Sequence, residues 1–230
     1  MGAFVTYLGA LGLIRAADEL RAGPVLALAA AIQVAPLTSP VLLSTDVYTY
    51  WDYGRLGAVH GANPYVDKPN RYRGDPAFSR MGRQWRDTTT VYGPAFTLAS
   101  EGHAAAVGAS RPAAAWSYKA LAALAMLGIL WLVGRLAPRP FAAAFVGWNP
   151  LLAIHFAGGG HNDAWMVAFV MAALALAATG RRQLAGAGWA LAIAIKWVAA
   201  IFLPLRAVQA WRAGRRVGHV AFAATAVLLA

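Results

Sequence analysis

Long apolar stretches separated by short polar connections run along most of the chain. A helix needs about 20 apolar residues to cross a bilayer, and several stretches approach this length. The pattern predicts an all-α fold, a polytopic bundle of about six to eight transmembrane segments. The segments expected are residues 24–44, 92–108, 113–134, 141–157, 164–179 and 183–205, with partial segments at 1–14 and 217–230.

Proline, glycine and lysine interrupt these stretches at defined places. Pro36 and Pro40 predict a kink in the stretch 24–44, because proline removes a helical hydrogen bond. Lys196 lies in the middle of 183–205, and we expect this stretch to enter the membrane and return, with a break near the lysine. The stretch 92–108 is the least apolar, since it carries Glu101 and His103, and a re-entrant or tilted path is expected there.

One long polar segment, residues 45–91, follows the first full-length stretch. It holds seven of the 20 lysine and arginine residues and five of the nine acidic residues. We expect it to be an outer loop that carries chemistry within a single domain spanning residues 1–230. Both ends of the chain fall inside apolar runs, which predicts a fragment of a longer protein.

Composition supports the membrane class and excludes others. The chain is 60% hydrophobic and 13% charged, whereas soluble domains carry about 25% charged residues. The net charge of +11 does not indicate nucleic-acid binding, because the basic residues lie in short connections and in one loop. Basic connections at 181–182 and 206–216 are typical of the cytoplasmic side, which places the turn 158–163 on the outer face. Arg15 and Arg21 precede the first full-length stretch and are expected inside, which places the loop 45–91 on the outer face. With no cysteine, disulfides and thiolate metal sites are excluded.

The first candidate site lies where the loop begins. Ser44 or Thr45 can cap a helix that starts there, and Asp46, Tyr50 and Tyr53 then share one face of that helix. Asp52 lies about 120° away around the helix, so the two carboxylates point apart. Asp46, at the edge of apolar surroundings, is a candidate general base. The alternative is an interfacial helix with an aromatic belt.

The second candidate site is the turn that runs from Gly158 to Asp163. Its glycines allow close backbone approach, and His161, Asn162 and Asp163 can bind sugar hydroxyls or phosphate. The spacing of His155, His161 and Asp163 matches no strong metal pattern, so no metal site is predicted. Ionisable residues at membrane depth are functional candidates.

Three further features remain open between function and structure. Lys196 can face a cavity and bind a phosphate, or it can snorkel toward the interface. Arg55 belongs to a basic loop that is either a solvated surface or a clamp for a lipid phosphate. Asn63-Pro64-Tyr65 and Tyr92-Gly93-Pro94 indicate turns, and Tyr92 is retained as a candidate substrate contact.

Several of these motifs, in this order, are familiar. Asp46-Val47-Tyr48-Thr49-Tyr50, Asn63-Pro64-Tyr65, Tyr92-Gly93-Pro94, Asn149-Pro150 and Gly160-His161-Asn162-Asp163 are followed by an apolar run with a central Lys196. Over residues 24–212 this order resembles the C-type membrane glycosyltransferase superfamily. It is most similar to the polyprenyl-phosphate-mannose-dependent alpha-1,6-mannosyltransferases of lipomannan assembly.

The resemblance implies a function and a location. A sugar, expected to be mannose, passes from a polyprenyl-phosphate carrier to a hydroxyl of a glycan or lipid-linked acceptor on the outer face of a bacterial plasma membrane. Asp46 matches the family's base, with Asp52 as runner-up, and no dedicated cofactor is needed. His161, Asn162, Asp163 and Lys196 match the other polar positions and, with Tyr50, Asp52, Arg55 and Tyr92, are the expected substrate contacts.

Two alternatives from other classes remain. A transporter or lipid flippase would use buried His, Asp and Lys residues as a relay, but it predicts paired repeats that the chain does not show. A non-catalytic membrane fragment or partner subunit is the third hypothesis.

Overall fold

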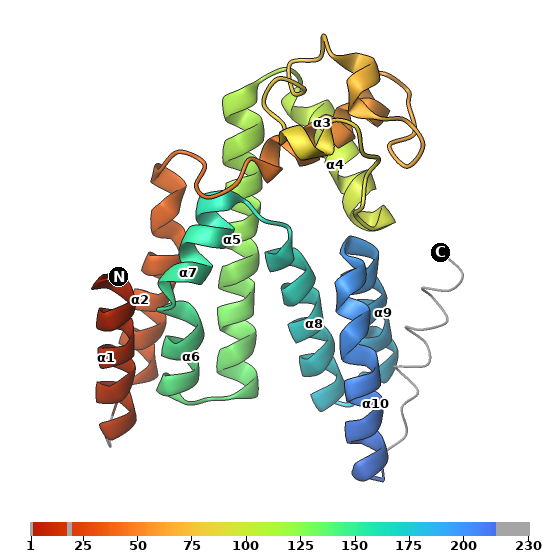
Figure 1. Cartoon of the computed structure of the whole chain (residues 1–230). Helices are drawn as coiled ribbons and strands as arrows, with labels where there is room; N and C mark the ends of the chain where they lie inside the picture. The colour runs from red at the N-terminus through yellow and green to blue at the C-terminus, as the bar shows by residue number, and fades with distance from the viewer. Residues whose placement is uncertain (1, 18–19, 215–230) are drawn as a thin grey trace. The chain divides into compact units, whose positions relative to one another are not determined.

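The computed structural model describes residues 2–17 and 20–214, and these residues are helical or irregular, with no strand (Figure 1). This confirms the all-α prediction for the described part of the chain. The chain divides into two compact units, Met1–Tyr48 with Ser110–Ala164 and Thr49–Ala109 with Trp165–Ala230.

The first unit is built around one long helix, α5 (Arg111–Leu136). Helix α2 (Ala22–Val34) packs on α5 and on α6 (Pro140–Gly147), and α1 (Gly2–Ala16) packs on α6. Three short elements form the end of the unit that carries the glycine turn. They are the 3-10 turn η1 (Ala35–Thr38), the helix α7 (Pro150–Ala153) and the π-helical turn η4 (Ile154–Gly158).

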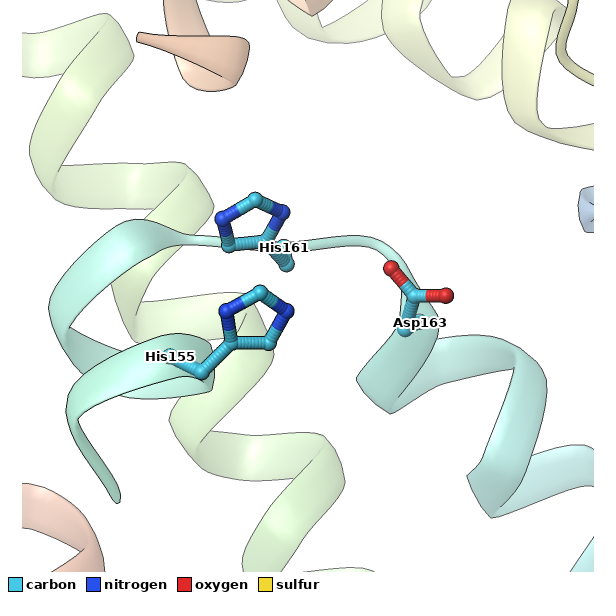
Figure 2. A group of neighbouring side chains, drawn as sticks. All are labelled: His155, His161 and Asp163. Atoms are coloured by element: carbon cyan, nitrogen blue, oxygen red, sulfur yellow. The ribbon is translucent and has the colours of Figure 1, made fainter. Parts of the chain in front are cut away.

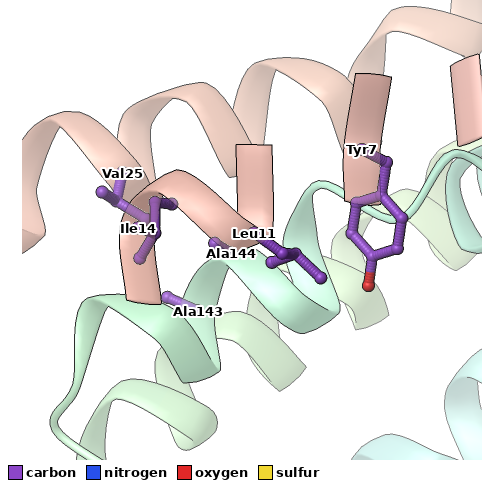
Figure 3. Close-up of a cluster of buried hydrophobic side chains, with 6 residues drawn as sticks. All are labelled: Tyr7, Leu11, Ile14, Val25, Ala143 and Ala144. Carbon is purple, nitrogen blue, oxygen red and sulfur yellow. The ribbon is translucent and has the colours of Figure 1, made fainter. Parts of the chain in front are cut away.

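A small apolar core joins α1, α2 and α6. Tyr7, Leu11 and Ile14 of α1 face the close-packed alanines of α6 (Figure 3). The hydroxyl of Tyr7 donates to the carbonyl of Phe145 at 2.6 Å, so the one polar atom of this cluster is satisfied. The small alanine side chains let the helices approach closely, which anchors α1 to the unit.

The second unit contains most of the segment 45–91 and the last helices. Helix α3 (Asp46–Ala58) has its first turn in the first unit and continues here. Helix α8 (Asp163–Ala178) likewise begins at the last residues of the first unit, and α4 packs on α9. The other bounds are η2 (Pro69–Tyr72), η3 (Arg83–Trp85), α4 (Pro94–Val107), α9 (Arg182–Ile195), η5 (Trp197–Ile201) and α10 (Phe202–Arg212).

The expected six to eight membrane segments are more than the structure supports. Within residues 2–17 and 20–214, α5 is long and apolar enough to cross a membrane, and the pair Pro140–Gly147 and Pro150–Gly158, bent by 49°, adds a second if it acts as one broken span. The other apolar helices are shorter than a bilayer requires, because proline or a turn ends them early. The expected segment 217–230 lies outside the described residues.

Two expected interruptions are confirmed. Helix α2 gives way to a 3-10 turn at Ala35, directly before Pro36. Helix α9 ends at Ile195, and Lys196 has an extended backbone with φ −151° and ψ 118°. The stretch 92–108 forms only the 14-residue helix α4.

Candidate active site

The glycine turn lies directly against the segment that leads into α3. The N–H of Leu42 donates to the carbonyl of Gly158 at 3.0 Å. Gly160 has φ +67°, and a Cβ there would overlap Cγ1 of Val47, a side chain with no exposed surface. Glycine is therefore required at position 160 for both its backbone conformation and the close approach. The close approach expected of the glycine run is made within the protein, to the side chains of Leu42 and Val47.

A strained turn then presents the start of α3. Leu43 has φ +64°, and the N–H of Ser44 donates to the carbonyl of Leu42 at 2.8 Å, which together make a γ-turn of the rare positive-φ type. The hydroxyl of Ser44 accepts a hydrogen bond from the N–H of Asp46 at 3.0 Å. The predicted helix start is confirmed, and Ser44 holds the first turn where Asp46 lies.

Asp46 and His161 are brought together although 115 positions separate them. Nδ1 of His161 lies 3.4 Å from Oδ2 of Asp46. The side chain of Asp46 remains 24% exposed, whereas that of His161 is 9% exposed. Asn162 follows and is almost fully buried, while Asp163 begins α8. The pairing of the loop aspartate with the second polar turn is thus present within the first unit.

His155 joins this group from the π-helical turn η4. Its ring stacks on that of His161 with centroids 3.9 Å apart and an interplanar angle of 10°. Figure 2 shows the two stacked rings and the Asp163 carboxyl group beside them. One ligand atom from each of these three residues lies within 4.8 Å of the others. Single π-helical turns occur frequently at functional sites, where they redirect a side chain.

Lys119 is a buried lysine to which the sequence pattern assigned no role. It lies on α5 with 2% of its surface exposed, and its ammonium donates to the carbonyl of Ser39, with those of Leu37 and Pro40 at 3.5 and 3.4 Å. It therefore satisfies the carbonyls at the end of η1 and holds the segment that leads to Asp46. A lysine inside the strongest apolar stretch was the signal that could have identified it.

Asp52 lies in the second unit, on the buried side of α3. Only 3% of the residue is exposed. Burial, with the nearby charge of Asp75, raises the pKa of Asp52 to about 7, although Arg55 and Arg86 oppose the shift. The hydroxyl of the neighbouring Tyr53, whose pKa is also raised by burial, donates to the carbonyl of Thr88 at 2.8 Å. Asp52 is thus a carboxyl group whose pKa lies near neutral pH and which has little access to solvent.

Arg55 is engaged by an acidic partner from the middle of the loop. Its Nε lies 2.7 and 2.9 Å from the two carboxylate oxygens of Asp75, and its Nη1 donates to the carbonyl of Gly108 at 2.8 Å. Nε2 of His60 lies 2.8 Å from the same carboxylate. Burial favours a higher pKa for Asp75, but the bonds from Arg55, the Ala77 N–H and His60 outweigh it and lower that pKa. Arg55 fastens the loop to α3, and its contact with substrate stays a prediction.

The two proline turns of the loop meet in an aromatic cluster. The hydroxyl of Tyr65 donates to the carbonyl of Tyr92 at 2.9 Å, and it also lies 3.0 Å from the Thr97 hydroxyl. Tyr92 packs edge-on against Tyr50 and Phe96, with ring centroids 5.1 and 5.2 Å away. Tyr50 and Tyr92 are buried here, and their proposed contacts with substrate stay predictions.

Lys196 lies where the second proline turn docks. The N–H of Gly93 donates to the carbonyl of Ile195 at 3.1 Å, and a Cβ on Gly93 would overlap the carbonyl of Ala194. The turn thus packs on the break in the apolar stretch and fixes the backbone directly before Lys196. That Lys196 shares a cavity with Asp46 stays a prediction, since the two belong to different units.

The proteins that the chain resembles in sequence all belong to one family. Residues 1–212 match the family described as alpha-(1->6)-mannopyranosyltransferase, N-terminal domain. The chain is 32% identical to alpha-(1->6)-mannopyranosyltransferase A of Corynebacterium glutamicum over 168 residues, 71% of this chain and 34% of the relative. It is also 32% identical to the protein of the same name from Mycobacterium tuberculosis over 214 residues, 86% of this chain and 40% of the relative.

A third relative is described as a probable alpha-(1->6)-mannopyranosyltransferase, from Mycolicibacterium smegmatis. It is 32% identical over 151 residues, which cover 63% of this chain and 27% of the relative. No solved structure gives a significant match. The chain spans 27–40% of the length of these relatives. Since the family match extends over nearly the whole sequence, the chain belongs to the alpha-(1->6)-mannopyranosyltransferase family and corresponds to its N-terminal domain.

Proposed function

We propose that the chain forms the part of a membrane mannosyltransferase that carries its base. The enzyme transfers mannose from a polyprenyl-phosphate carrier to a hydroxyl group of a glycan or lipid-linked acceptor on the outer membrane face. The observation that carries the proposal is the pairing of Asp46 with His161, because it joins the two polar motifs that the family resemblance implicates. The names of the relatives support the sugar and the reaction type.

The geometry favours Asp46 over Asp52 as the base. A base must come within hydrogen-bond distance of the acceptor hydroxyl. The Asp46 side chain is 24% exposed and stands at the first turn of α3, whereas Asp52 is 3% exposed as a residue and surrounded by the loop. The near-neutral pKa of Asp52 would suit a base, but access decides in favour of Asp46.

The reaction then proceeds in one displacement. The Asp46 carboxylate accepts the proton of the acceptor hydroxyl while the hydroxyl oxygen bonds to the anomeric carbon of mannose. The bond between that carbon and the carrier phosphate breaks, and the phosphate leaves with the electron pair, which inverts the anomeric centre. His161, at 3.4 Å, acts as a positioning residue that holds the Asp46 carboxylate. Because the donor is already activated, no nucleotide is required.

Transfer of labelled mannose from polyprenyl-phosphate-mannose to an alpha-mannan acceptor, in membranes that contain the protein, tests the proposal. Asp46→Asn should lower the rate roughly 10²–10⁴-fold, the usual contribution of a general base. Asp87→Asn is a matched control, because that aspartate is exposed and bonds only the side chain of Asn70 among the interactions described for it. If Asp46→Asn transfers at the wild-type rate, Asp46 is not the base. If the wild-type protein uses only a nucleotide-linked donor, the carrier assignment is wrong.

A further inference from the structure

His155, His161 and Asp163 come from three different local structures and meet at one point. His155 lies on η4, His161 in the glycine turn and Asp163 at the first residue of α8. One ligand atom of each lies within 4.8 Å of the other two. The sequence spacing did not suggest a metal site, because it is the π-helical turn and the positive φ of Gly160 that bring the residues together.

We propose that these three side chains bind a divalent transition-metal ion of the zinc class. Two imidazoles and one carboxylate are a ligand set that suits Zn²⁺, and three protein ligands leave a fourth position for a water or ligand oxygen. A hard cation such as Mg²⁺ would instead require mostly oxygen ligands. The donor types therefore select the class of ion.

The observed spacing is slightly wider than that of an occupied site. Ligand atoms at about 2.0–2.2 Å from a tetrahedral ion lie roughly 3.4 Å from one another. An ion would therefore draw the present atoms together by roughly 1–1.5 Å at most. The His155 and His161 rings are stacked nearly parallel, and an imidazole nitrogen binds a metal in the plane of its ring, so the His155 ring must also turn out of the stack. His155 and Asp163 are only partly buried, so rotation of their side chains can provide both movements without moving α5 or α8.

Asp46 lies beside this group. Its Oδ2 is 3.4 Å from Nδ1 of His161, whereas Nε2 of His161 is fully buried and packs against the backbone of Gly159. An ion held through Nδ1 of His161 would therefore lie near the Asp46 carboxylate, whose negative charge would favour its binding. The metal titration contains no sugar, so it tests the ion independently of the transfer reaction.

Metal binding by the full 230-residue chain, purified in detergent without a histidine tag and stripped with a chelator, tests the inference directly. Titration with Co²⁺ should give the intense visible absorption of a tetrahedral site at one ion per chain, and Zn²⁺ should displace it. His155→Gln and Asp163→Asn should each weaken Co²⁺ binding by more than tenfold. Asp46→Asn should weaken it less than either of these two variants, because it removes only a nearby negative charge.

His103→Gln is the matched control, because His103 lies on α4 in the other unit. It should bind Co²⁺ as the wild-type chain does. Asp163→Asn preserves the shape of the side chain, and far-ultraviolet circular dichroism checks that each variant keeps its helices. Less than one ion per chain, or equal affinity in the wild-type and both ligand variants, would overturn the inference. Since no sugar substrate is present, this outcome is independent of whether mannose is transferred.

Discussion

A single methyl group at Gly160 tests how the candidate site is assembled. Gly160→Ala adds a Cβ that overlaps Cγ1 of Val47 and lies 3.3 Å from the backbone nitrogen of Lys119. Val47 has no exposed surface, so its side chain cannot move outward to relieve the overlap. The same substitution places a non-glycine residue at φ +67°. Two separate costs therefore arise at one position.

The two costs can be given magnitudes. The left-handed conformation costs a non-glycine residue about 1–2 kcal/mol, and overlap in a packed region costs about 1–3 kcal/mol. Against these stands a gain of about 0.4–1 kcal/mol, because alanine is less flexible than glycine in the unfolded chain. We expect Gly160→Ala to lower the free energy of unfolding by about 2–4 kcal/mol. At roughly 2–4 °C per kcal/mol for a chain of this size, the melting temperature should fall by about 4–16 °C.

Two other glycines serve as controls that separate the costs. Gly180 has φ +77° but open space around its Cβ position, so Gly180→Ala should lose only about 1 kcal/mol. Gly128 lies inside α5 with nothing within 4 Å, and Gly128→Ala should gain about 0.5–1 kcal/mol from helix propensity. The order of stability should therefore be Gly128→Ala, wild type, Gly180→Ala and then Gly160→Ala.

Tryptophan fluorescence during heating in detergent is a suitable assay. The chain has nine tryptophans, and thiol-reactive dyes cannot be used because it has no cysteine. Val47→Ala should partly rescue Gly160→Ala, since it removes the overlapping methyl group, and a double-mutant cycle should show favourable coupling. If Gly160→Ala is no less stable than Gly180→Ala, the glycine turn does not pack on α3 and the Asp46–His161 pairing loses its structural basis.

Two further predictions concern the second unit. Asp75→Asn should cost about 3–5 kcal/mol, because it leaves the buried Arg55 charge without its ionic partner. Asp67→Asn should cost under about 1 kcal/mol, since the ion pair it removes is with the exposed Arg71 and the asparagine oxygen can still accept the Asn63 N–H. Equal melting temperatures for the two variants in the same fluorescence assay would contradict this. The pKa of Asp52 is about 7 in the folded protein, against about 3.9 in an unfolded chain. Between pH 4 and pH 7 the folded state therefore binds one more proton than the unfolded state. The contribution of Asp52 to the free energy of unfolding is thus complete below pH 4 and is lost as the pH rises to 7. Asp52→Asn should therefore stabilise the chain by roughly 2–4 kcal/mol at pH 8 and leave it almost unchanged at pH 4, and unfolding midpoints in denaturant at the two pH values measure the difference; an equal effect at both values would refute the assignment.

Local signals in the sequence were enough to determine much of the secondary structure. The start of α3 follows from Ser44 and Asp46, which act on adjacent backbone groups. The break at Lys196 follows from a charge placed in an apolar run, and the end of α2 follows from Pro36. Helix α5 follows from the longest uninterrupted apolar stretch. Each of these signals works over a few neighbouring residues, and a linear pattern therefore displays it.

The number of membrane-crossing helices was overestimated for a related reason. Hydropathy counts apolar residues in a window, whereas the length of a helix also depends on where its backbone hydrogen bonds stop. Helix α9 ends at Ile195, where the carbonyl accepts the N–H of Gly93 from a distant turn. Helix α6 ends before Asn149-Pro150, where the path bends by 49°. The apolar runs were correctly located, but shorter helices occupy them.

The partners of the polar side chains were decided by the tertiary structure. The order of motifs singled out Asp46 and His161, yet the 3.4 Å contact requires the glycine turn to pack on Leu42 and Val47. Nothing in the sequence indicated that Asp75 would bind Arg55 and His60, or that the rings of His155 and His161 would stack. The sequence by itself determined which residues can act as bases, ligands and caps, because those properties belong to the side chains. Only the tertiary structure decided which of them meet, because that depends on the packing of segments far apart in the chain.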